Sequence, residues 1–194
     1  MLSLMLGVAQ VLMGASNALS DGKAIVAGPD GKLVVEITIE PSIGKPMYAI
    51  TYDGKTVLEP SALGLVSTDA DYSKDMAIIS AVVEPVSKKY SQNHIKRSKI
   101  EFIANQMIVG LGDSSGRHVM DVEFMVANND VAFRYVLPKV GEPSGIRVMD
   151  ETTSFTFPAY TTTFLSPQSD PMIGWKRTKP SYEEEYRLDR PMSE

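Results

Sequence analysis

Three consecutive carboxylates near the end of the chain are the residues best suited to chemistry. Glu183, Glu184 and Glu185 lie between two tyrosines in the stretch WKRTKPSYEEEYRLDRPMSE. Adjacent acids repel one another unless solvent, lysines or a cation intervenes. Calcium is bound by such oxygens and accepts roughly six to eight of them. The cluster therefore indicates either part of a calcium site or an ordinary solvated run of charge.

The other reactive side chains do not form a recognisable catalytic set. His94 and His118 are the only histidines, and no G-x-S-x-G stretch supplies a nucleophile beside them. The chain has no cysteine, which excludes disulfides, thiol catalysis and zinc–thiolate sites. Asp121 and Glu123 share one face of an expected strand, and we expect that face to be solvated. The G-x-G at 110–112 precedes no helix pattern, so it does not predict a dinucleotide loop.

The charge balance argues against two classes of partner. The formal net charge is −5 at pH 7, and no run of Lys and Arg is longer than two residues. Nucleic acids and anionic membranes select basic surfaces, so we expect no nucleic-acid partner and no membrane partner.

The first residues have the composition of a secretory signal peptide. Residues 1–18 read MLSLMLGVAQVLMGASNA, an apolar run followed by small residues, with Ser16 and Ala18 placed like a cleavage site. The run is too short to span a membrane. No Lys or Arg precedes it, which departs from the usual pattern. The alternative is a buried amphipathic helix, but the run lacks a polar face. The segment predicts export.

The rest of the chain has the two-residue period of half-buried strands. Alternating apolar runs cover residues 33–39, 48–52, 120–126 and 131–137. Turn sequences separate such runs at 29–31, 53–54, 113–116 and 128–130. Regularly spaced strands without a helical stripe predict an all-β fold, a large antiparallel β-sandwich with about ten to twelve strands. A single domain is expected over residues 22–194.

Two segments are expected to differ from this pattern. Residues 73–79 could form a short helix. Beyond Pro158, the stretch PAYTTTFLSPQSDPMIGWKRTKPSYEEEY is rich in proline and poor in alternation. That composition predicts an ordered loop or crossover rather than a sheet.

Four stretches in this order resemble the N-terminal domain of glycoside hydrolase family 97, a family of bacterial α-glucosidases and α-galactosidases. They are GPDGKLVVEI, MYAITYDGKTVLEPSALGL, MDVEFMVANNDVAFRYVLP and FPAYTTTFLSPQSDPMIGWKRTKPSYEEEY. The resemblance covers about residues 22–194. It implies a β-supersandwich similar to galactose mutarotase, followed by a catalytic (β/α)8 barrel that this chain lacks.

The resemblance also gives the acidic cluster a role. In the family, the N-terminal domain lends one glutamate to a calcium ion of the barrel, from the segment that matches SYEEEY. Alignment on the preceding tyrosine selects Glu183, which we prefer, and alignment on the following tyrosine selects Glu185. Glu184 lies between them. The partners implied are the barrel and an oligosaccharide substrate, and the compartment implied is the periplasm, outer membrane or exterior of a bacterium.

Two functions therefore remain open. The first is a non-catalytic, carbohydrate-binding-type domain of an exo-acting, calcium-dependent α-glycosidase, inactive without its barrel. The alternative is a free-standing β-sandwich that binds carbohydrate or acts as a scaffold. The residues that separate glucoside from galactoside, and inversion from retention, lie on the barrel.

Overall fold

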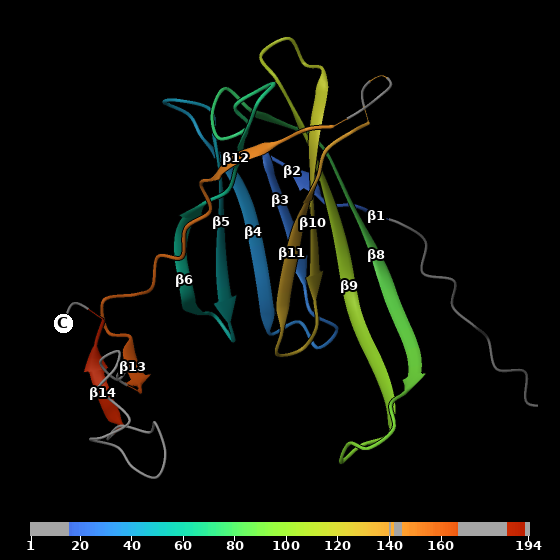
Figure 1. The fold of residues 1–194 in the computed structure, drawn as a ribbon, viewed down its shortest axis with the longest axis vertical. Helices are drawn as coiled ribbons and strands as arrows, with labels where there is room; N and C mark the ends of the chain where they lie inside the picture. The colour runs from blue at the N-terminus through green and yellow to red at the C-terminus, as the bar shows by residue number, and fades with distance from the viewer. Residues whose placement is uncertain (1–15, 140, 142–144, 167–185, 193–194) are drawn as a thin grey trace, which may run out of the picture. The chain divides into compact units, whose positions relative to one another are not determined.

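Two five-stranded antiparallel sheets form the main part of the molecule (Figure 1). The computed structural model describes residues 16–139, 141, 145–166 and 186–192. Sheet I has the order β2-β3-β4-β5-β6, and sheet II has the order β1-β8-β9-β10-β11. The strands of sheet I are β2 (Leu19–Ser20), β3 (Lys23–Ala27), β4 (Leu33–Glu40), β5 (Lys45–Tyr52) and β6 (Lys55–Ala62). Those of sheet II are β1 (Ser16–Asn17), β8 (Ala77–Ser91), β9 (Lys99–Gly112), β10 (His118–Val126) and β11 (Val131–Val136).

Short turns connect neighbouring strands where the sequence predicts them. Asp53 and Gly54 both have positive φ, at 49° and 74°, which is the conformation of a tight two-residue hairpin turn between β5 and β6. The predicted turn at residues 128–130 joins β10 to β11 and is closed by a 2.9 Å hydrogen bond from the Ala127 amide to the Asp130 carbonyl. The turns at 29–31 and 113–116 are confirmed as well, by hydrogen bonds at Gly31 and Gly116. The all-β antiparallel prediction is therefore confirmed.

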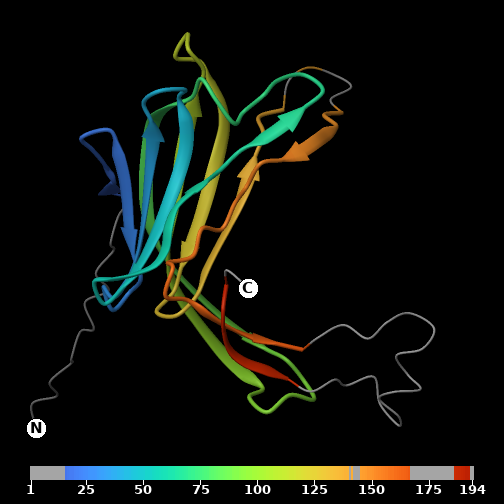
Figure 2. The same cartoon turned by 90° about the vertical axis from the view of Figure 1, so that its left-hand side faces the viewer.

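The inner faces of the two sheets enclose one apolar core (Figure 2). The register of β10 and β11 places Phe124 opposite Phe133, on the predicted inward face. From sheet I, the ring of Tyr48 lies 6.2 Å from that of Phe124 and 5.5 Å from that of Phe133. Tyr48 and Phe124 are fully buried and Phe133 is partly buried. These three rings join the sheets.

The helix suggested for residues 73–79 is wrong. Residues 73–75 form a bend, and β8 begins at Ala77. The Asp71 carboxylate accepts hydrogen bonds from the Ser73 amide at 3.0 Å and the Ser73 hydroxyl at 2.6 Å. An Asp side chain that captures the backbone two residues later closes a turn and competes with a helix. The amides of Asp75 and Met76 also donate to the loop at 43–44.

A short strand pair lies beside the sandwich, and a second pair replaces the loop expected after Pro158. The first joins β7 (Leu65–Ser67) to β12 (Val148–Glu151). The second joins β13 (Thr162–Leu165) to β14 (Arg187–Pro191), so the prediction of no sheet in this region is wrong. Pairing across more than twenty residues leaves no local period in the sequence, which is why it was not foreseen. The chain forms two compact units, residues 1–156 and 157–194.

Strands β8 and β9 continue past the sandwich as a two-stranded ribbon (Figures 1 and 2). Strand β10 pairs with β9 only as far as Asn105, and β1 pairs with β8 only at Val82 and Val83. Beyond these points the two strands pair with each other, from Val86 and Ala104 to Ser91 and Lys99. Among the described residues, no helix is long and apolar enough to cross a membrane.

Replacing Phe133 by Ala should lower the free energy of unfolding by about 3 kcal/mol, because the ring fills the space between Tyr48 and Phe124. Denaturant titration measures the change. Ile43→Ala is the control, since that side chain is 51% exposed at the turn between β4 and β5 and its loss should cost less than about 0.5 kcal/mol. Equal effects for the two variants would place Phe133 outside the core.

Candidate functional site

The predicted calcium ligands, Glu183, Glu184 and Glu185, lie outside the described residues, but their flanks are well defined. Leu165 of β13 pairs with Arg187 of β14, so the chain between them starts and ends at neighbouring positions. The glutamates directly precede Tyr186, the residue before β14. Whether one of them binds calcium stays a prediction.

The base of this segment is held by an aromatic contact and by hydrogen bonds. The ring of Tyr186 lies 5.1 Å from that of Phe164. The Thr163 hydroxyl donates to the Arg190 carbonyl at 3.1 Å, and the Met192 amide donates to the Thr161 carbonyl at 3.3 Å. These contacts fix the start of β14, the strand next to the acidic residues. The two rings are at least half exposed, with apolar area that a further partner could cover.

The Glu123 carboxylate, on the outer face of sheet II, is paired with neighbouring side chains. Arg134 donates from Nη2 and Nε to the Glu123 carboxylate at 2.6 and 2.7 Å, and Gln106 donates to the same oxygen at 3.4 Å. These side chains line an open groove of about 340 Å³. The two aromatic residues of the groove lining, Phe124 and Phe133, pack with their rings against Tyr48 in the core. We assign this cluster to strand pairing.

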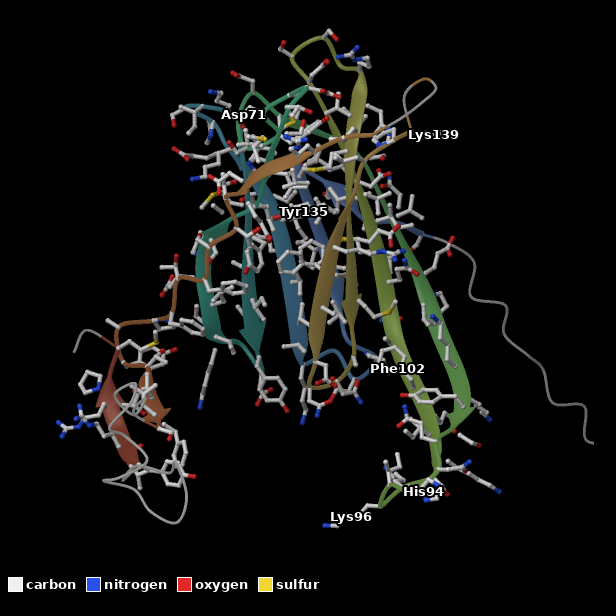
Figure 3. All side chains as sticks on the ribbon, viewed as in Figure 1. Asp71, His94, Lys96, Phe102, Tyr135 and Lys139 are labelled. Atoms are coloured by element: carbon white, nitrogen blue, oxygen red, sulfur yellow. The ribbon has the colours of Figure 1, made fainter. Side chains whose placement is uncertain are left out.

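The only two histidines do not assemble a catalytic group. His118 Nε2 lies 2.7 Å from Asp121 Oδ1 on the outer face of β10, and both side chains are partly exposed. His94 lies at the tip of the β8–β9 ribbon (Figure 3). Within the described part of the chain, no three His, Cys, Asp or Glu side chains come together in a way that could hold a metal ion.

Two carboxyl groups of the described residues have a pKa that departs from its usual value, and both pKa values are lowered. Hydrogen bonds from the Ser73 side chain and amide, with a smaller contribution from Lys74, hold the pKa of Asp71 below its usual value. A hydrogen bond from the Ser115 hydroxyl does the same to the pKa of Asp113. A general acid for glycoside hydrolysis needs the opposite shift. Asp71 and Asp113 are turn-closing residues.

Buried tyrosine hydroxyls attach a strap, residues 152–156, to the sandwich. The Tyr48 hydroxyl donates to the Ser154 carbonyl at 3.1 Å. The Tyr135 hydroxyl lies 2.7 Å from the Thr153 hydroxyl and accepts a 2.9 Å hydrogen bond from the Gly64 amide. The strap then leads to Thr156, the last residue of the first unit. The sequence pattern treated both tyrosines as ordinary core residues, although a buried phenol needs a partner.

Comparison with known proteins identifies the family. The profile described as Glycosyl-hydrolase 97 N-terminal matches residues 26–194. The chain belongs to this family. A probable retaining alpha-galactosidase from Streptomyces bingchenggensis (strain BCW-1) is 32% identical over 145 residues, which make up 74% of this chain and 21% of that protein.

Solved structures agree with the fold of this N-terminal family. The crystal structure of a beta-arabinopyranosidase matches with a TM-score of 0.74 and 45% identity, over 88% of this chain and 27% of that one. A glycoside hydrolase family 97 enzyme from Pseudoalteromonas sp. strain K8, solved with panose and with acarbose, matches with a TM-score of 0.66 and 26% identity. That match covers 75% of this chain and 22% of the enzyme. The chain thus spans about a quarter of the length of these relatives.

The buried Tyr48 should make the stability of this family 97 domain fall at high pH. Burial, with a smaller effect of nearby Tyr135, raises the pKa of Tyr48 from 10.0 to about 12. The unfolded chain therefore releases this proton first, so the contribution is complete below pH 10 and is lost as pH rises to about 12. Chemical denaturation between pH 8 and 12 measures it, and Tyr48→Phe should flatten the decline. An identical decline in both proteins would contradict the assignment.

Proposed function

We propose that this chain is the N-terminal, non-catalytic, carbohydrate-binding-type domain of an exported, exo-acting α-glycosidase. One observation carries the proposal: the family profile covers residues 26–194, while the relatives continue for about three further quarters of their length. A (β/α)8 catalytic barrel would follow the domain and pack against it. Oligosaccharides would be the substrate of the whole enzyme.

The chemistry of the described carboxylates supports a non-catalytic role. Glycoside hydrolysis requires two carboxyl groups on opposite sides of the scissile bond, roughly 5 to 10 Å apart. Glu123 is occupied by Arg134, and Asp113 forms an ion pair with Arg117. Asp71 closes a turn. The domain would therefore contribute packing and position, and the proton transfers would belong to the barrel.

The relatives favour one substrate class. The 45% identical structure is named a beta-arabinopyranosidase and the 32% identical protein a probable retaining alpha-galactosidase. L-Arabinopyranose has the ring-hydroxyl arrangement of D-galactopyranose and lacks only its hydroxymethyl group. The relative solved with panose and acarbose is 26% identical. We therefore propose galactose-configured glycosides rather than α-glucosides.

Calcium would bind between this N-terminal domain and the catalytic barrel. Glu183 would be the ligand from this chain, with Glu184 and Glu185 as alternatives. Carboxylate oxygens have the right chemistry, because calcium is a hard cation. Three adjacent glutamates do not by themselves surround an ion with roughly six to eight oxygens, because neighbouring side chains point apart wherever a backbone is extended. The ion would supply a fixed positive charge that binds oxygen atoms. Glu183 would hold it from the domain side.

Export is supported by the composition of residues 1–18, which lie mostly outside the described part. Ser16 and Asn17 pair with Val83 and Val82 at the edge of sheet II, so cleavage after Ala18 would remove this edge strand. The mass of the mature protein, recovered from outside the cytoplasm, determines the cleavage site. Recovery of the uncleaved chain from the cytoplasm alone would reject export.

The proposed function predicts that activity requires the catalytic domain. The 194-residue chain should release no nitrophenol from aryl α-galactosides, aryl β-L-arabinopyranosides or aryl α-glucosides, because the part of it that the structure describes offers no assigned acid and base on opposite sides of a sugar site. The complete gene product should hydrolyse one of the first two and prefer it to the glucoside. Steady turnover by the 194-residue chain, or a stop codon directly after Glu194, would refute the proposal. Retention of the chain on immobilised oligosaccharide would then favour the free-standing binding module.

Within the complete enzyme, Glu183→Gln should raise the calcium concentration for half-maximal activity by about tenfold or more, because a charged oxygen ligand is lost. Glu185→Gln is the matched control, with the same chemical change two residues away. Calcium titration of EDTA-treated enzyme gives the midpoints. The reverse ranking would assign the ligand to Glu185. Unchanged midpoints in these two variants and in Glu184→Gln would return the cluster to solvated surface charge.

A further inference from the structure

The β8–β9 ribbon extends away from the core, and along it the two strands pair only with each other. Its paired residues run from Val86 and Ala104 to Ser91 and Lys99, and the Gln92 amide closes the tip on the Ser98 carbonyl at 2.8 Å. Six residues per strand at about 3.3 Å each give an arm of roughly 20 Å before the tip. Two-stranded hairpins are at best marginally stable in water. Except at its base, where Ala104 is buried, the ribbon is more exposed to solvent than the rest of sheet II.

Apolar side chains remain exposed along this arm. Tyr90, Ile95 and Ile103 are 46%, 47% and 52% exposed. The register puts Tyr90 opposite Ile100 on one face of the ribbon, with Phe102 beside them on the same face. Ile103 lies on the other face, opposite Ser87. Both faces thus offer area that a partner could bury.

The arm is also strongly basic within an acidic chain. Residues 88–101 contain five cationic side chains and one carboxylate, whereas the whole chain has a net charge of −5. Lys89 pairs with Glu101 at 3.2 Å. Among the described residues, no ion pair involves the other four cations of the arm, which are Lys88, Lys96, Arg97 and Lys99. Figure 3 shows Lys96 at the tip, beside His94.

We propose that the ribbon, residues 86–104, is a docking arm that packs against a carboxylate-bearing surface of the catalytic domain. The inference rests on the proposed function. Cations that alternate with aromatic and aliphatic side chains form the kind of surface that pairs with acids at a protein interface. The relatives' chains continue well beyond the matched region, so the arm of this domain has a large covalently linked neighbour available.

Covalent linkage favours this occupant over a second copy of the chain. The chain outside residues 88–101 is acidic, so a second copy could also meet the arm by charge. A linked domain, however, is present at an effective concentration near the millimolar range, which a secreted monomer does not reach. The arm therefore contacts the domain of its own polypeptide first.

Hydrogen exchange of the ribbon amides tests the proposal. In the 194-residue chain, amides of residues 86–91 and 99–104 should exchange quickly, because the arm opens locally. In the complete gene product they should exchange at least about tenfold more slowly. High salt should remove part of this protection, since exposed charge pairs are screened. Equal exchange in the two proteins would overturn the docking arm. So would a dimer of the 194-residue chain that already protects the ribbon.

A pair of charge-reversal substitutions provides a second test of the docking arm. Lys96→Glu with Arg97→Glu should restore fast ribbon exchange in the complete protein. Lys32→Glu with Lys55→Glu changes the charge equally at two exposed turns of sheet I and should leave the ribbon protected. Protection that survives reversal at 96 and 97 would reject a carboxylate partner.

Activity keeps the two proposals distinguishable. An active complete enzyme with an unprotected ribbon rejects only the docking arm, whereas an inactive enzyme with a protected ribbon rejects only the assigned function. If the complete product does not fold, the same exchange measurement applies to the beta-arabinopyranosidase in which residues 86–104 replace the segment that aligns with them. Fast exchange of the transplanted ribbon there, with the host domain intact, would also reject the arm.

Discussion

Tyr48 stands where three parts of the domain meet. Its ring contacts Phe124 and Phe133 of sheet II, while its own strand lies in sheet I. Its hydroxyl donates to the strap at Ser154. The aromatic contacts are stabilised by the burial of apolar surface. The strap is held instead by the hydrogen bond of the Tyr48 hydroxyl, a polar group inside that apolar region. A ring of the same size without the hydroxyl would keep the sheets together and leave the Ser154 carbonyl without this donor.

The route of the chain out of the sandwich follows from this arrangement. The strap also bonds to sheet I through Ser154, whose hydroxyl accepts the Ala62 amide, and through Thr156, whose amide donates to the Ser61 hydroxyl. Gly64 beside it has φ of 151°, and a Cβ there would meet the Ser73 backbone and the Thr152 hydroxyl. The exit point at Thr156 is therefore set by many small contacts with a packed surface.

Local sequence patterns predicted the sandwich well, because its strands and turns are determined by residues close together in the sequence. Alternation fixed the inward residues of β10 and β11, and Asx and Gly residues marked the turns. The features that sequence reasoning missed depend on distant partners. Leu165 pairs with Arg187 across the acidic segment, and Asp71 rather than an apolar stripe decides the shape of residues 73–75. The cations of the ribbon lie on two strands and a tip, so they form one patch in space without forming a run of consecutive basic residues in the sequence. The predicted ligands Glu183, Glu184 and Glu185 gain a structured flank at Tyr186 but no coordination geometry.

The outer edge of β8 has a consequence for how the polypeptide behaves during synthesis. Beyond Val83 this edge has no neighbouring strand among the described residues, and an unpaired edge invites another chain to add to the sheet. Pro85 lacks the amide hydrogen that such an addition needs, and Lys88 and Lys89 follow it closely on the same strand. These three residues act as gatekeepers against strand addition. A newly made domain is thereby protected from edge-to-edge association through its longest hairpin.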